Sequence, residues 1–84
     1  MNEPKPNRKA SRQIRLRLAD NVLQLRRTRG YTQQMLAERS GLSKSYVSNV
    51  EQATVNISLA NIEALADGLG CSEAALLVRP LGDR

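Results

Sequence analysis

Residues 32–52 read TQQMLAERSGLSKSYVSNVEQ, and this stretch decides the fold. Its pattern predicts two short helices joined by a tight turn. Thr32 and Ser43 stand just before the two helices, where a hydroxyl can accept a hydrogen bond from a free backbone amide. Between the helices, Gly41 supplies the left-handed conformation that a sharp reversal of the chain requires.

The two helices carry apolar residues with the spacing to face one another across the turn. These residues are Leu36, Ala37, Val47 and Val50. The small side chain of Ala37 lets the two helices cross closely. The stretch therefore has the pattern of a DNA-binding helix-turn-helix.

Three further helices are expected around this stretch. Apolar residues recur at helical spacing before it, at Ile14, Leu18, Val22 and Leu25, and after it, at Leu59, Ile62, Leu65, Ala66 and Leu69. The first helix begins just after Ser11 or near Leu16, since arginines in its early turns oppose the helix dipole. Ser58 and Ser72 are expected to cap the last two helices. The prediction is an all-α fold of five helices.

The positive charge is concentrated at the start of the chain. Of the net charge of +5, residues 1–17 hold six basic residues against one acidic residue, and the rest of the chain is balanced. We expect a flexible basic arm at 1–10, a helix-turn-helix DNA-binding domain at 11–79 and a short tail at 80–84. Basic arms commonly bind nucleic acid, although a solvated tail is an equal alternative.

Other functions find little support in the composition. The chain has one cysteine, Cys71, and no histidine, so we expect no disulfide, metal site, cofactor or enzymatic activity. We expect Cys71 to be a small buried residue rather than a redox sensor. The longest apolar run, residues 74–78, is far too short to cross a membrane, and a cytoplasmic location fits best.

The chain resembles the lambda-repressor/Cro-like (XRE-type) helix-turn-helix family over roughly residues 18–78. That family includes phage repressors, Cro proteins and the controller proteins of restriction–modification systems. The resemblance rests on Arg26, Gly30-Tyr31-Thr32-Gln33, Leu36-Ala37, Gly41-Leu42-Ser43, Tyr46-Val47-Ser48, Val50-Glu51 and Asn56-Ile57-Ser58-Leu59 in register. It implies a five-helix lambda-repressor-like domain that binds double-stranded DNA. The string from Asn56 to Ile62 looks more like the controller proteins.

The outward face of the second helix of the motif is expected to read bases in the major groove. The candidate base contacts are Lys44, Ser45, Ser48 and Asn49. Lysine can donate to guanine and asparagine can pair with adenine, while the serines can donate or accept.

Contacts to the DNA backbone are expected from short polar groups around the motif. The candidates are Gln33, Tyr46, Gln52, Thr54, Asn56 and Arg26. By resemblance, Gln33 touches phosphate and braces the recognition helix. Arg26 and Glu51 match a pair that bridges two helices in the family, which as an exposed pair would contribute about 0–1 kcal/mol.

Ala53 departs from the family, which usually has glycine just after the recognition helix. A left-handed alanine costs about 1–2 kcal/mol, so we expect this helix to end in another way. The following loop is also neutral where the family is usually basic, and the N-terminal arm can compensate.

The final helix is expected to form a homodimer interface. A helix cannot bury the unbroken apolar run at its end on one side, and an exposed apolar patch usually marks an interface. The expected contacts are Leu69, Ala75, Leu76, Leu77 and Val78, with Leu76 or Leu77 at the centre. In the family this region is where the small regulators pair, which implies a near-palindromic operator.

The leading hypothesis is a transcription regulator that acts as a homodimer and takes no evident small-molecule ligand. A controller protein and a phage or plasmid repressor both fit, and the sign of regulation stays open. The alternative is an antitoxin-like module that binds a protein and regulates its own gene.

Overall fold

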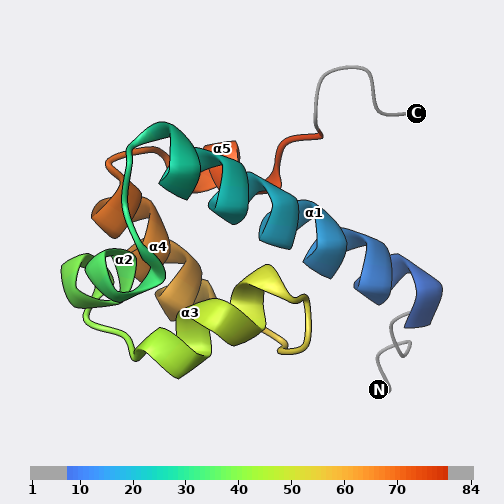
Figure 1. Ribbon diagram of the computed structural model, residues 1–84. Coiled ribbons are helices and arrows are strands. Elements are labelled where there is room, and N and C mark those ends of the chain that lie inside the picture. Colours follow the sequence, from blue (N-terminus) through green and yellow to red (C-terminus); the bar gives the residue numbers. More distant parts are fainter. Residues whose placement is uncertain (1–7, 80–84) are drawn as a thin grey trace.

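The computed structural model describes residues 8–79, which form five helices (Figure 1). These are α1 (Arg8–Thr28), α2 (Gln33–Ser40), α3 (Lys44–Glu51), α4 (Leu59–Leu69) and α5 (Glu73–Leu77). Residues 8–79 contain no strand. The predicted all-α, five-helix fold is therefore confirmed.

Four of the helices begin at the hydroxyl caps that the sequence predicts. In each case the side-chain oxygen accepts from the backbone amide three residues further on. The caps are Thr32, Ser43, Ser58 and Ser72. Each bond satisfies an amide that has no partner within its own helix.

The first four helices end in one shared motif, in which a left-handed residue closes the last turn. Glycine holds this position after α1, α2 and α4, whereas Ala53, with φ of 59°, holds it after α3. The Ala53 amide donates to Val50 O and the Thr54 amide to Asn49 O, each at 3.0 Å. The expectation that α3 ends differently was wrong, because these bonds offset the strain of a left-handed alanine.

Helix α1 is longer than the sequence indicated. It begins at Arg8 rather than just after Ser11 or near Leu16, so it includes residues 8–10 that were assigned to the arm. Its N-terminal end extends past the other helices, while α3 and the loop that follows lie beneath it (Figure 1). Residues 1–7 and 80–84, and the expectations for them, lie outside the described residues.

The core is aliphatic and receives side chains from all five helices. Its fully buried large residues are Val22, Leu36, Val47, Val50, Leu65, Leu69 and Leu76. Two residues of the expected apolar stripes lie outside it, since Ile14 is 39% exposed and Leu59 is 84% exposed. Ile14 belongs to the overhanging part of α1, and Leu59 stands in the first turn of α4.

Helices α2 and α4 approach one another closely at Gly68. A Cβ built on Gly68 would lie 2.2 Å from Ser40 Oγ and 3.2 Å from Leu36 Cδ1. Arg39 reaches across the same contact and donates from Nε to Gly68 O at 2.8 Å. The absence of a side chain at Gly68 therefore lets α2 pack closely against α4.

Replacing Ala53 with glycine is expected to raise the free energy of unfolding by about 0.5–1 kcal/mol. Glycine adopts the left-handed conformation without the Cβ strain, and this gain exceeds the extra entropy of the unfolded chain. The matched control is Gly41→Ala. Gly41 has a φ of 70°, and a Cβ built there meets no atom within 4 Å, so only the backbone conformation is strained. This substitution should lower stability by about 1 kcal/mol. Urea unfolding measures both, and a loss of stability in Ala53→Gly would contradict the assignment.

Candidate DNA-binding surface

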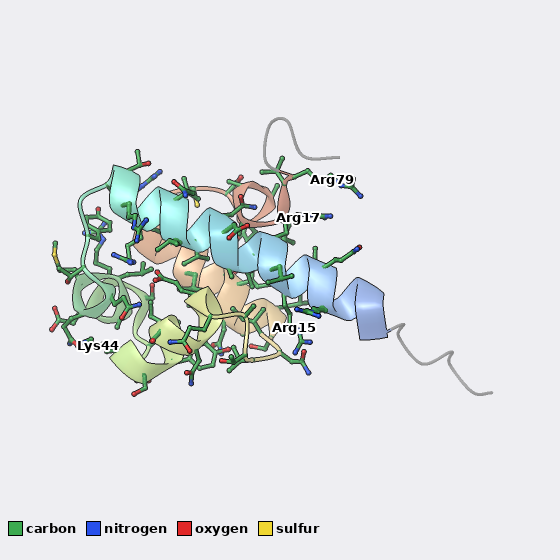
Figure 2. The ribbon with its side chains drawn as sticks, turned by 45° about the vertical axis from the view of Figure 1, so that its right-hand side comes forward. Arg15, Arg17, Lys44 and Arg79 are labelled. Carbon is green, nitrogen blue, oxygen red and sulfur yellow. The ribbon has the colours of Figure 1, made fainter. Side chains whose placement is uncertain are left out.

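Helices α2 and α3 together present a polar surface with a shallow hollow. The residues that line it are Gln33, Lys44, Ser45, Ser48 and Asn49. The structure thus brings all four candidate base contacts together with Gln33. Lys44, Ser45 and Asn49 are exposed and Ser48 is half-buried. Figure 2 shows Lys44 at the start of α3, on the outer edge of the molecule.

The opposite face of α3 is apolar and buried. Val47 is 0% exposed and Val50 is 2% exposed, and both belong to the core. One face thus anchors the helix in the core, while the polar face lies at the surface beside the start of α2. The donors and acceptors on it are of the kinds that match base edges.

A hydrogen-bond network around Glu51 holds α3 to two other helices. Arg26 of α1 donates to both carboxylate oxygens, from Nε at 2.6 Å and from Nη2 at 3.1 Å. Gln33 of α2 donates from Nε2 to Oε1 at 3.0 Å. Arg26 also donates from Nη1 to Tyr31 O at 2.8 Å. The carboxylate therefore links the end of α3 to the end of α1 and to the start of α2.

The Arg26–Glu51 pair, which the resemblance implied, is well shielded from water. The two side chains are 13% and 6% exposed, so the pair is not the exposed one expected from the sequence, and losing one partner would leave a buried charge without its counter-ion. The hydrogen bond that Arg26 donates to Glu51 raises the pKa of Arg26 above its ordinary value, against the opposing effect of burial. Arg26 is therefore protonated at neutral pH.

Of the other candidates for backbone contact, Tyr46 lies within α3 and the rest follow its end, and several already have partners. Tyr46 Oη accepts from Asn61 Nδ2 at 3.0 Å, which ties α3 to α4. Gln52 Nε2 donates to Ser48 Oγ at 3.1 Å. Thr54 Oγ1 donates to Asn49 O at 3.1 Å, which closes the end of α3. Asn56 is exposed in the following loop.

Part of the expected dimer interface was wrong. Leu69 is 1% exposed and Leu76 is 0% exposed, because both fill the core of the single chain. Ala75 and Leu77 are half-buried, and Val78 is 57% exposed. An apolar groove lies between α4 and α5 instead, lined by Leu59, Ala60, Ile62, Glu63, Glu73 and Leu77. We call it the α4–α5 groove.

Two asparagines with structural roles were missed from the sequence. Asn21 Nδ2 donates to Leu76 O at 2.9 Å and to Val78 O at 2.8 Å, and so holds the end of α5 against α1. Asn61 holds Tyr46, as described above. The only signal in the sequence was a polar residue beside an apolar helical stripe in each case.

Other kinds of site are not indicated in the part of the chain that the structure describes. Within residues 8–79, no three His, Cys, Asp or Glu residues gather as a metal site, and no helix is long and apolar enough to cross a membrane. Cys71 is half-buried, and burial is the main cause that raises the pKa of its thiol. A raised pKa disfavours the reactive thiolate.

The fold and the polar face of α3 define a helix-turn-helix protein, and the comparisons agree. The sequence model of a helix-turn-helix family matches residues 22–76. The chain belongs to this family of transcription regulators, and the expected membership is confirmed.

A hypothetical transcription factor of Neisseria meningitidis is 42% identical over 67 residues, which span 80% of this chain and 63% of that protein. The crystal structure of a hypothetical transcription factor from Neisseria matches with a TM-score of 0.79 at 36% identity, covering 95% of this chain and 88% of that one. The restriction-modification controller protein C.AhdI from Aeromonas hydrophila matches with a TM-score of 0.72 at 37% identity, covering 74% and 94%. These relatives are regulators, and none is described as an enzyme.

Proposed function

We propose that the protein is a sequence-specific regulator of transcription that binds double-stranded DNA as a homodimer. The observation that carries this proposal is the exposed polar face of α3, which is backed by buried Val47 and Val50 and held by Glu51. A face held in this way can enter the major groove without first becoming ordered, which limits the entropic cost of binding. We propose a cytoplasmic location, because a regulator of transcription has to reach the DNA that it binds.

Base reading is assigned to Lys44, Ser45, Ser48 and Asn49. Asn49 offers both a donor and an acceptor and can pair bidentately with adenine. Lys44 can donate to guanine, and Ser48 keeps its hydroxyl proton free to donate while its oxygen accepts from Gln52. The two serines are short, so α3 must lie deep in the groove for them to reach base edges.

Backbone contacts are assigned to the residues on either side of α3. Gln33 lies at the start of α2, beside the base-reading face, and its amide is oriented by Glu51. Tyr46 and Gln52 have hydrogen-bonding capacity left beyond their internal partners, and Asn56 is exposed. Thr54 and Arg26 are mainly structural, since Thr54 closes α3 and Arg26 bonds Glu51 and Tyr31.

The α4–α5 groove is assigned to pairing with a second copy of the chain. Leu59 and Val78 are the most exposed large apolar residues of the described chain, and Leu59 lines the groove together with Leu77. Two-fold pairing covers the same apolar patch on both copies. Pairing would place two recognition helices about 34 Å apart, which is one turn of DNA, and would require a near-palindromic operator.

The base-reading assignment predicts that Asn49→Ala costs about 1–3 kcal/mol of binding energy on the cognate operator and much less on random DNA. The operator is first obtained by selecting bound sequences from a random pool. Gln24→Ala, which removes an exposed amide from α1, is the control and should bind as the parent does. Equal losses on both kinds of DNA would make Asn49 a backbone contact.

The dimer assignment predicts that Leu59→Glu yields a folded monomer that binds the full operator weakly. Leu59 is exposed in the single chain, so the new charge disturbs folding little but cannot enter an apolar interface. Sedimentation at several concentrations measures the association. The control is Met35→Glu, an exposed apolar residue of α2 that should leave the dimer intact. If Leu59→Glu remains dimeric, the interface lies elsewhere.

A further inference from the structure

The side of α1 that packs toward α3 carries arginines where the helix extends beyond the core. On this side Arg26 bonds Glu51 of α3, and Val22 and Ala19 are buried. The same steps of three and four residues lead to Arg15 and Arg12, which share one side of the helix with them. These two arginines therefore lie on the overhanging part of α1, on its α3 side.

Arg15 is in an unusual state for a surface arginine. The residue is half-buried, and its Nε is buried without a hydrogen-bond partner among the described residues. Most buried polar groups have a hydrogen-bond partner, and a buried donor without one is destabilising. Arg15 therefore holds donating capacity that the described residues leave unused.

Arg15 and Arg17 lie two residues apart on α1, and their side chains point to different sides of the molecule. Figure 2 shows Arg15 on the side where α3 and Lys44 lie, next to the loop that follows α3. Arg17 lies on the opposite side, near Arg79. The first arginine is thus placed toward the base-reading surface and the second away from it.

The loop beneath this part of α1 carries no charge of its own. It reads QATVNIS from residue 52 to residue 58. When α3 lies in the major groove, a phosphate strand borders it on each side. In the proposed docking, Gln33 and the start of α2 stand at one border, and this neutral loop stands at the other. A cation at the second border has to come from a neighbouring element, and the overhanging part of α1 is that element.

We propose that Arg12 and Arg15 bind DNA phosphates at the border of the groove opposite Gln33. The site rests on the proposed DNA-binding function and extends it, since both residues precede the segment 22–76 that the family shares. The planar guanidinium fork of arginine matches a phosphate group with two parallel hydrogen bonds.

The test compares Arg12→Gln/Arg15→Gln with Arg17→Gln on the full chain. The probe is a 30-base-pair duplex of arbitrary sequence, because phosphate contacts do not depend on sequence. Fluorescence anisotropy gives the slope of log K against log salt concentration. Each phosphate contact contributes about 0.9 to this slope, so the double variant should lose about 1.8. Arg17→Gln removes one charge from the same helix and should leave the slope unchanged.

Three results would overturn the proposal. The slope of the double variant can remain that of the parent. The slope can fall as much per charge in Arg17→Gln, which would show a long-range charge effect only. The dimer of the double variant can instead separate into monomers while the salt slope stays unchanged, which would make the arginines a contact between copies.

Two checks keep the outcome interpretable. If the double variant fails to fold by circular dichroism, Arg12→Gln alone replaces it, since Arg12 is exposed, and about half of the effect is expected. If the parent protein does not bind the duplex at all, the proposed function itself fails. Binding by the parent together with an unaltered slope in the variant overturns only the arginine site.

Discussion

The hydrogen bonds to the Glu51 carboxylate are the interaction that holds α3 in position to expose its polar face. The carboxylate accepts from Arg26 on α1 and from Gln33 on α2, so the end of one helix is fixed to two others. The Arg26 and Glu51 side chains are largely withdrawn from water, so removing either one would leave the charge of the other buried without its partner. Because Gln33 also borders the base-reading hollow, the same carboxylate orients a candidate DNA contact. Stability and recognition are therefore joined at one residue.

Much of this architecture was predictable because local chemistry determines it. The hydroxyl caps at Thr32 and Ser43 and the left-handed Gly41 mark where the helices of the motif begin and end, and the structure has them there. The polar and apolar faces of α3 follow from helical spacing alone, so the buried positions of Val47 and Val50 were also predicted. For the site, the spacing placed the four candidate base contacts on one face, and the structure shows them around one hollow. Their contacts with DNA remain predictions.

The rest was not predictable because it depends on neighbours that are distant in the sequence. Leu76 and Leu77 are equivalent in a sequence pattern, and only the path of α5 across α1 makes Leu76 a core residue and leaves Leu77 half-buried. That path is held by Asn21, some 55 residues earlier in the chain. Ala53 takes a strained conformation because two backbone bonds and the loop after it favour this end for α3. The burial of Arg15 Nε without a partner within residues 8–79 likewise has no signal in the sequence.

The central claim is that Glu51 couples the stability of the fold to the presentation of α3, and a double-mutant cycle tests it most directly. Arg26→Met, Glu51→Gln and the double variant are each examined by urea unfolding and by titration with the selected operator. We expect the two substitutions to be non-additive by about 1.5–3 kcal/mol in unfolding, with weaker operator binding in each single variant. If their effects add to within about 0.5 kcal/mol and operator binding is unchanged, Glu51 does not hold the recognition helix.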